Sequence, residues 1–367
     1  MFRSAWLSRV GLCAVATLGV GVLAAPAQAA TTGVASVVES TKVQYKAAKG
    51  KQNKVVVTRS GRTVTIDDTV AIHPGKGCKA VTGDRTRVRC TPAKAPTRVR
   101  VYTYDRNDSI VNDTDLPMTA DGGTGNDKVT GGPRGDILRG DRGRDTIRGL
   151  GGNDRIDGSY DNDHLYGGDG NDRFEDGFGN DVVHGGNGDD SFFVDPGNDK
   201  FYGDAGNDEV LAFEPYKEQI YDDADLFSGG VGDDVLIYAY SRDVTIDADG
   251  AVGDDGAKGE HDSIAADFES LYGGSGNDHI YGTARDELLG GGEGNDVIVG
   301  YGGNDILLGD VGTDKLYGGT GNDWLDGHDF NTDDVKDLLD AGPNTDNGDT
   351  CRPTPSDVVV GCERVTR

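Results

Sequence analysis

The chain has 367 residues, with 64 acidic against 36 basic side chains and a formal net charge of −28. Residues 121–367 hold the imbalance, since 56 acidic and 18 basic residues lie there. An acidic block of this kind repels nucleic acid and anionic membranes and attracts hard cations. We therefore expect no nucleic-acid partner.

Residues 1–29 have the features of a secretory signal peptide. Arg3 and Arg9 flank the start of a short apolar run, and Ala27-Gln28-Ala29 fits a small-residue cleavage site. A membrane anchor is the alternative, but the apolar run is short and no other long one follows. We predict cleavage after Ala29, no membrane span in the mature chain, and a secreted protein that is free or attached to the cell wall.

Residues 30–120 predict a small N-terminal β domain. The stretch NKVVVTRSGRTVTIDD resembles two strands about a Ser60-Gly61 turn, and TRVRVYTYD alternates like a third strand. The region holds 16 basic and 8 acidic residues. This excess of positive charge suits contact with an anionic surface, or it is simply a solvated face.

Four of the five cysteines follow the predicted cleavage site, in two close couples. Cys78 and Cys90 form one couple, and Cys351 and Cys362 form the other. Four cysteines allow three disulfide connectivities, of which pairing within each couple is the simplest in an oxidising compartment. A zinc site is disfavoured, because the histidines are scattered and the cysteines lack C-x-x-C spacing.

A nine-residue repeat begins at Gly122 and continues for ten copies, giving a predicted unit at 121–211. The sixth position is aspartate in all ten copies, and the eighth is apolar in all ten. A disordered Gly/Asp-rich linker would not preserve this phase. The repeat is therefore structural.

The repeat is interrupted over residues 212–272, which contain one further copy at 229–237. The frame then resumes for six copies within a second predicted unit, 273–345. Residues 346–367 are predicted to form a disulfide-closed C-terminal cap, because solenoids need atypical terminal caps.

Each repeat combines a glycine-rich turn, an aspartate and a three-residue strand. Glycines at the first, second and fourth positions permit a tight turn that exposes carbonyl oxygens. The central side chain of the short strand points inward, and stacked copies make a continuous core. Carboxylate and carbonyl oxygens without clustered imidazole or thiolate select Ca²⁺ over zinc or copper.

The copies GGTGNDKVT, GGDGNDRFE, GGSGNDHIY and GGTGNDWLD resemble the hemolysin-type calcium-binding repeats of the RTX (repeats-in-toxin) family. The resemblance implies an all-β fold, a right-handed parallel β-roll with two repeats per coil and several Ca²⁺ ions between successive turns. The interrupted segment and the two cysteine couples also resemble secreted calcium-binding repeat proteins of actinobacteria. Mutual repulsion of the aspartates predicts a roll that is unfolded or loose without calcium.

The predicted ligands fall into two sets. The carboxylate ligands are Asp127, Asp136, Asp145, Asp154, Asp163, Asp172, Asp181, Asp190, Asp199, Asp208, Asp234, Asp278, Asp296, Asp305, Asp314 and Asp323. The backbone ligands are Gly123, Gly125, Gly168, Gly170, Gly186, Gly188, Gly274, Gly276, Gly319 and Gly321. Weaker or absent sites are expected where Arg134, Val194 and Glu287 replace residues of the pattern.

These observations favour a calcium-dependent extracellular scaffold or binding module that is not an enzyme. A less favoured alternative is an accessory region of a secreted hydrolase, because residues 30–120 contain neither of the catalytic motifs H-E-x-x-H and G-x-S-x-G. The second alternative is a surface adhesin or matrix component with an unknown extracellular or cell-wall partner, recognised by the N-terminal domain. A flat aromatic or Thr-x-Thr row on one face of the roll would favour it, but the ninth positions of the repeats show no such regularity.

Overall fold

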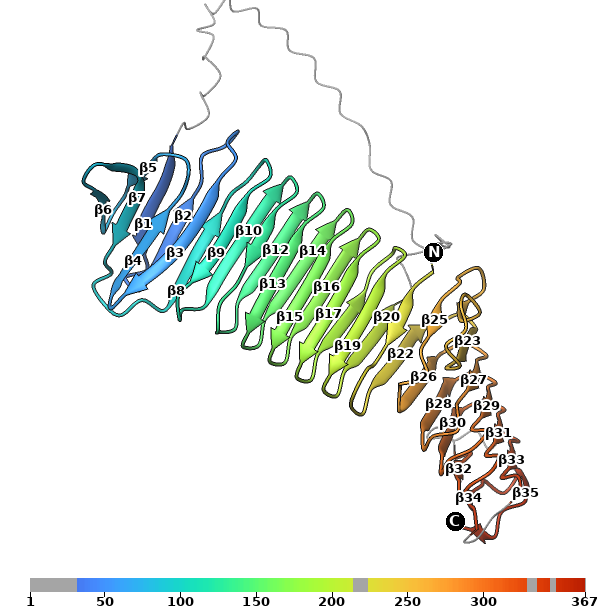
Figure 1. The fold of residues 1–367 in the computed structure, drawn as a ribbon. Helices are drawn as coiled ribbons and strands as arrows, with labels where there is room; N and C mark the ends of the chain where they lie inside the picture. The colour runs from blue at the N-terminus through green and yellow to red at the C-terminus, as the bar shows by residue number, and fades with distance from the viewer. Residues whose placement is uncertain (1–31, 214–223, 329–334, 344–347, 367) are drawn as a thin grey trace, which may run out of the picture.

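The computed structural model describes residues 32–213, 224–328, 335–343 and 348–366, and it is an elongated stack of short β-strands (Figure 1). The predicted signal peptide lies outside these residues. The described residues form strands and turns. They contain no helix, and therefore none that is long and apolar enough to cross a membrane.

From residue 118 to residue 365, one long sheet runs along the stack through pairings that are parallel at every step. Its strands are β10 (Met118–Thr124), β12 (Ile137–Arg142), β14 (Arg155–Tyr160), β16 (Arg173–Phe178), β18 (Ser191–Val194), β20 (Glu209–Phe213), β22 (Val235–Tyr240), β26 (Ser270–Gly274), β28 (Leu288–Glu293), β30 (Ile306–Val311), β32 (Trp324–Asp326), β34 (Thr350–Arg352) and β36 (Arg364–Val365).

Two short sheets follow one another along the other side of the stack. The first short sheet contains β9 (Ser109–Asp113), β11 (Lys128–Thr130), β13 (Thr146–Gly151), β15 (His164–Asp169), β17 (Val182–Asn187), β19 (Lys200–Ala205), β21 (Leu226–Ser228) and β25 (Ser263–Ile264). The second contains β23 (Val244–Asp247), β24 (Gly256–Ala257), β27 (His279–Tyr281), β29 (Val297–Val299), β31 (Lys315–Tyr317), β33 (Leu338–Asp340) and β35 (Val358–Val360).

The N-terminal strands continue the long sheet and the first short sheet. They are β1 (Gly33–Val38), β2 (Lys42–Lys46), β3 (Lys54–Ser60), β4 (Thr63–Asp67), β5 (Ile72–Pro74), β6 (Cys78–Val81), β7 (Asp84–Cys90) and β8 (Arg98–Tyr102). The parallel pairs β2–β8 and β8–β10 extend the long sheet, and β3–β9 extends the first short one. Sheet pairing is therefore continuous across residue 120, where we expected a domain boundary.

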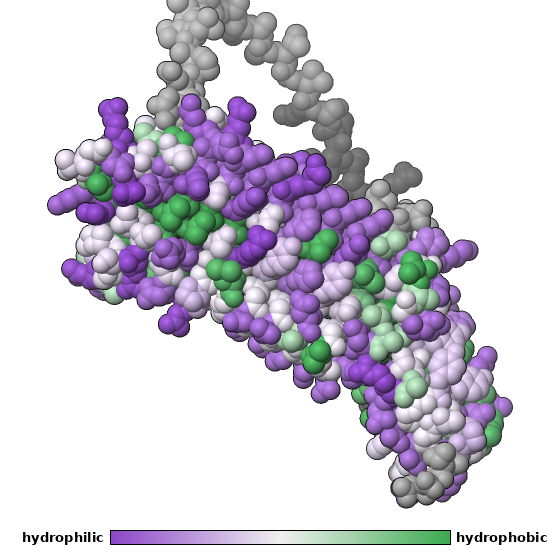
Figure 2. Space-filling model, viewed as in Figure 1, coloured by the Kyte–Doolittle hydropathy of each residue, from purple (hydrophilic) through white to green (hydrophobic). Residues whose placement is uncertain are grey.

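Two nine-residue repeats make one coil, so paired strands are offset by eighteen residues. Leu138 pairs with Ile156, which pairs with Phe174 in the long sheet, and Ile147 pairs with Leu165 opposite. Alternate residues of a strand face opposite sides, and the eighth position of every repeat is at most 1% exposed. These side chains form the core, and the face drawn in Figure 2 is largely hydrophilic. The predicted parallel β-roll is confirmed.

The interruption of the repeat does not interrupt the long sheet, because β20 pairs with β22 and β22 with β26. On the opposite side the first short sheet ends at β25 and the second begins at β23 and β24. The division into units at 121–211, 212–272 and 273–345 thus remains a prediction about domains, while the strand pairing is shared by all three.

Both disulfides pair within the close couples, as predicted. Cys78–Cys90 joins the paired strands β6 and β7, and Cys351–Cys362 joins β34 to the segment before β36. Each therefore lies near one end of the stack, where a terminal strand has fewer neighbours to hold it.

Neighbouring residues of β12 test the direction of the side chains. Leu138 is fully buried and Ile137 is 45% exposed. In calcium-saturated protein, Leu138→Ala should lower the free energy of unfolding by about 2–5 kcal/mol, because it leaves a cavity. Ile137→Ala should cost about 1 kcal/mol or less. Denaturant unfolding followed by circular dichroism measures both, and equal losses would contradict the inward orientation of Leu138.

Candidate calcium-binding turns

The sixth-position aspartates form ladders of buried carboxylates along the edges of the roll. The backbone N–H of Asp127 donates to Oδ1 of Asp145 at 2.6 Å, and that of Asp145 donates to Oδ1 of Asp163 at 2.7 Å. All sixteen predicted aspartates are at most 3% exposed. One carboxylate oxygen of each rung therefore ties one coil to the next.

The ladders extend beyond the residues that the repeat predicted. Asn53 donates its backbone N–H to Asp108, and Asp108 donates to Asp127. Asp199 in turn donates to Asp225, twenty-six residues further along the chain. The acceptors that sequence reasoning missed are Asp108, Asp225, Asp262, Glu269, Asp337, Asp349, Asp357 and Glu363.

A short signal could have found these additional acceptors. Each is followed, two residues later, by an apolar side chain, as in Asp108-Ser109-Ile110 and Asp225-Leu226-Phe227. The glycine-rich turn of the full repeat is absent before them. The acid-x-apolar triplet is thus shared by all these rungs, whereas the glycine-rich turn is not.

In most of the sixteen predicted aspartate ligands, the second carboxylate oxygen, Oδ2, has no hydrogen-bond donor among the described residues. This is so for Oδ2 of Asp127, Asp145, Asp154, Asp163, Asp172, Asp181, Asp190, Asp208, Asp234, Asp278, Asp296, Asp305 and Asp323. A buried carboxylate oxygen without a partner is costly. A row of them fits a protein that takes up cations, because a cation supplies the missing partner.

In the repeats that begin with glycine, this first glycine makes room for the oxygen. A Cβ added to Gly149 would lie 1.9 Å from Oδ2 of Asp154, and one added to Gly167 would lie 2.1 Å from Oδ2 of Asp172. Any side chain would therefore displace the carboxylate. Glycine is required here because of close approach.

Turn carbonyl oxygens also stack from coil to coil. Gly168 and Gly186 both have positive φ, and a Cβ on Gly186 would lie 2.3 Å from the carbonyl oxygen of Gly168. Nine of the ten predicted backbone ligands have positive φ, Gly276 being the exception. The turns thus bring carbonyl oxygens and carboxylates to the same edges of the roll, as a hard cation requires.

The repeats match a known protein family in eight overlapping segments. The family is the RTX calcium-binding nonapeptide repeat, and the matches cover residues 119–147, 130–165, 139–174, 148–181, 175–210, 266–298, 281–316 and 308–329. The matched segments of the roll are RTX repeats. No curated protein matches the chain.

The match identifies the repeats of residues 119–210 and 266–329 as calcium-binding repeats, which supports a calcium-binding β-roll. RTX repeats are a structural, calcium-binding type of repeat and are not themselves catalytic. The buried aspartates suit calcium because carboxylates are hard oxygen ligands and because most of their Oδ2 atoms lack a hydrogen-bond donor among the described residues. The individual ligands and the number of ions remain predictions.

Two RTX turns that depart from the pattern supply their own donors. Oδ2 of Asp136 accepts the backbone N–H of Gly132 at 2.7 Å, in the turn that contains Arg134. Glu287 accepts both the backbone N–H and the hydroxyl of Thr283. These acids need a cation less than their neighbours do, which supports the expectation of weaker sites there.

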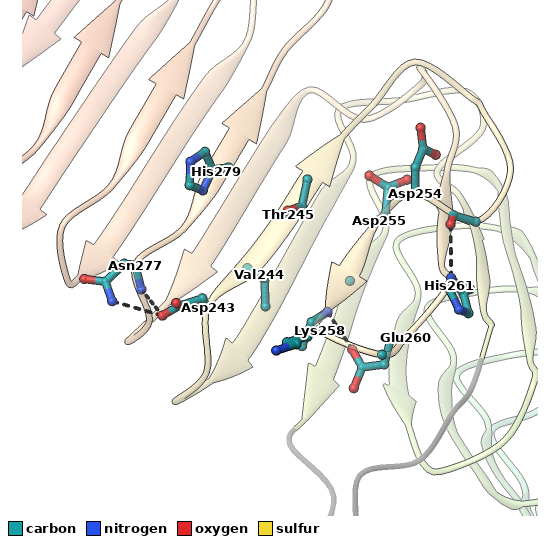
Figure 3. A pocket seen from close by; sticks show the side chains of 14 residues that line it. Asp243, Val244, Thr245, Asp254, Asp255, Lys258, Glu260, His261, Asn277 and His279 are labelled. Carbon is teal, nitrogen blue, oxygen red and sulfur yellow. Dashed lines mark hydrogen bonds between the residues drawn. The ribbon is translucent and has the colours of Figure 1, made fainter.

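An open pocket of about 390 Å³ lies where the second short sheet begins (Figure 3). Asp243, Asp254 and Lys258 contribute to its lining, as do His261 and His279. Nδ1 of His261 lies 3.3 Å from the carbonyl oxygen of Gly253, and the two histidines lie apart from one another in Figure 3. The pocket therefore brings no histidine pair together for catalysis or metal binding.

Burial raises the pKa of the RTX aspartates, backbone N–H donors lower it, and neighbouring carboxylates raise it further. The pKa of Asp154 is about 8, that of Asp163 about 9 and that of Asp305 about 8. The metal-free roll therefore binds protons more tightly than the unfolded chain, whose aspartates titrate near about 3.9.

Stability of the metal-free roll should fall as the pH rises. The aspartates stabilise the fold fully below their unfolded pKa and lose this contribution as the pH passes through about 6 to about 9. We expect calcium-stripped protein to lose β-sheet circular dichroism between about pH 5 and about pH 9, and added Ca²⁺ to restore it at the upper end. A β signal that rises with pH in metal-free protein would contradict this account.

Proposed function

We propose that the protein is a secreted calcium-dependent scaffold whose RTX roll folds when its turns bind several Ca²⁺ ions. The observation that carries the proposal is the row of buried aspartate oxygens without donors. Extracellular location is supported by the predicted signal peptide and by two disulfides, which persist in oxidising compartments. In this proposal the roll is the functional unit and no reaction is catalysed.

The proposed ligands are the sixth-position aspartates together with turn carbonyl oxygens one coil away. Asp163 represents a complete site, because its Oδ2 has no donor among the described residues. Asp136 represents an incomplete one, because Gly132 already donates to it. The two residues are equally buried rungs of neighbouring ladders, so they form a matched pair.

Calcium titration of chelator-treated mature protein tests the proposal. Far-UV circular dichroism should show a cooperative gain of β signal with Ca²⁺, because the ions neutralise the buried carboxylates. Mg²⁺ should not reproduce it, since Mg²⁺ prefers to keep its waters. A metal-free protein that is fully folded at neutral pH and indifferent to calcium would refute the proposal.

Two variants locate the effect within the roll. Asp163→Asn should raise the calcium concentration at the midpoint of folding several-fold, because it removes a charged ligand. Asp136→Asn should shift the same midpoint less. Equal shifts would contradict the assignment of complete and incomplete turns.

A surface-binding component is the second candidate, and one observation favours it. Tyr166, His184 and Tyr202 are register neighbours on β15, β17 and β19, and their rings are stacked, with centroids 5.5 and 4.6 Å apart. The Arg148 guanidinium lies 4.8 Å from the Tyr166 ring centroid. The expectation that the roll lacks an aromatic row was wrong, because alternate repeats, not consecutive ones, share a sheet.

Because the rings are stacked face to face, the row presents the ring edges and the tyrosine hydroxyls on the first short sheet. Such polar edges can hydrogen-bond to the hydroxyl groups of a polysaccharide. If the row binds cell-wall polysaccharide, Tyr202→Ala should reduce co-sedimentation of the calcium-loaded protein with insoluble polysaccharide several-fold. Tyr317→Ala, on the second short sheet, is the control and should bind like the unaltered protein. Equal binding of both variants would reject the row as a binding face.

A further inference from the structure

The outward face of the first short sheet carries positive charge, although residues 121–367 are strongly acidic. It is formed by the seventh and ninth positions of alternate repeats, on β11, β13, β15, β17 and β19 (Figure 1). The middle residue of each strand points into the core, so its two neighbours point outward. These ten outward residues are exposed or half-buried, and they include two lysines, one arginine, two histidines and two tyrosines. None of the ten is acidic.

The matching positions of the long sheet balance their charges. On β12, β14 and β16, an arginine at the seventh or ninth position pairs with an acid of the same face. The pairs are Arg139 with Asp157 at 3.4 Å, Arg155 with Glu175 at 2.6 Å, and Arg173 with Glu175 at 3.5 Å. On the first short sheet, Lys128, Arg148 and Lys200 form no ion pair with any described residue. Two faces built from the same repeat therefore differ in whether their cations are neutralised.

Stacking holds polar groups in place on the first short sheet. The Arg148 guanidinium lies over the Tyr166 ring, and the stacked row continues through His184 to Tyr202. Nδ1 of His184 also lies 3.1 Å from Oδ2 of Asp204, an acid of the adjoining turn. A guanidinium stacked by its face keeps its N–H edge available for a carboxylate or phosphate. The tyrosine hydroxyls at the ring edges can bond to sugar hydroxyls.

The spread of the cations indicates an extended ligand. Lys128 lies on β11 and Lys200 on β19, four strand spacings apart, which is roughly 19 Å. A ligand that reaches both lysines and Arg148 must carry several anionic groups along a chain. Single-stranded nucleic acid stacks its bases on free ring faces, whereas the rings of this row face one another. Ring edges and hydroxyls suit a polysaccharide instead.

We propose that this face binds an anionic polysaccharide, whose carboxylate or phosphate groups contact Lys128, Arg148 and Lys200. The inference deepens the second candidate function, and it rests on the proposed calcium-dependent folding because the face exists only when the coils are stacked. Bound calcium neutralises the buried aspartates, and repulsion by the other acids is screened beyond ~8 Å at physiological ionic strength. The face therefore binds its partner in the calcium-loaded protein.

Binding to three dextrans tests the partner. Uncharged dextran, carboxymethyl dextran and dextran phosphate share one backbone, and each is immobilised and presented to the protein at a fixed free Ca²⁺ concentration. The unaltered protein should bind one or both charged polymers and not dextran, and added NaCl should weaken the binding. Biolayer interferometry measures the dissociation constants. The charged polymer that binds more tightly identifies the anionic group.

Single substitutions test the position of the binding face. Arg148→Gln and Lys200→Gln should each weaken binding to the charged polymer several-fold, because each removes a cation from the face. Arg139→Gln is the matched control, since Arg139 holds the ninth position of the neighbouring repeat but lies on the long sheet and is paired with Asp157. It should bind like the unaltered protein. Circular dichroism in calcium should show the same β signal for all three variants.

The outcomes separate this face from the calcium-dependent folding. If the protein gains β signal with calcium but binds neither charged dextran, the inference is wrong and the proposed folding stands. If Arg139→Gln weakens binding as much as Arg148→Gln, the total charge decides binding and the inference is again wrong. Tighter binding to single-stranded DNA, or self-association that Arg148→Gln abolishes, would assign the face to another partner. A β signal that is independent of calcium would refute the proposed folding, and the charged dextrans would still test the face.

Discussion

The roll depends on one arrangement, a buried aspartate carboxylate that is held by the coil before it and left open on its other oxygen. The backbone N–H of Asp145 donates to Oδ1 of Asp163, and the same bond recurs along each edge. This bond sets the eighteen-residue offset between coils. The second oxygen lies against a glycine that leaves it room. Each unit therefore gains order from the hydrogen bond and incurs an electrostatic cost at the same residue.

Neither an apolar side chain nor a neutral amide could replace the aspartate at the sixth position. Leucine or valine at the sixth position would avoid the charge, but it could not hold the N–H of the neighbouring coil. A neutral amide could accept that bond, but it would lack the charge that draws in a hard cation. Aspartate meets both needs only when a cation is present. In the proposed calcium-dependent folding, this makes the fold conditional on its surroundings.

The sequence predicted the roll wherever the glycine turn and the aspartate occur together. Outside those repeats the sequence did not predict the additional rungs, because insertions whose lengths are not multiples of nine shift the nine-residue frame. Asp225 lies twenty-six residues after Asp199, and Asp337 lies twenty-three after Asp314. The structure tolerates these lengths because only the acid-x-apolar triplet must fit the rung, while the turn before it can vary. Three-dimensional neighbours were also missed, as with Tyr166 and His184, because a single sequence does not show which repeats share a sheet.

The two ends of the roll are stabilised by other contacts than its middle. An inner coil is held on both sides by carboxylate ladders, whereas an end coil has one free sheet edge. At the N-terminal end the antiparallel pair β1–β2 and the disulfide between β6 and β7 replace the missing neighbour. At the C-terminal end the Cys351–Cys362 bond lies beside the last rungs, Asp349 and Glu363. The disulfides thus lie at the ends of the roll, where the carboxylate ladders end. The proposed calcium-dependent roll, with a disulfide near each end, suits a compartment that is oxidising and calcium-rich.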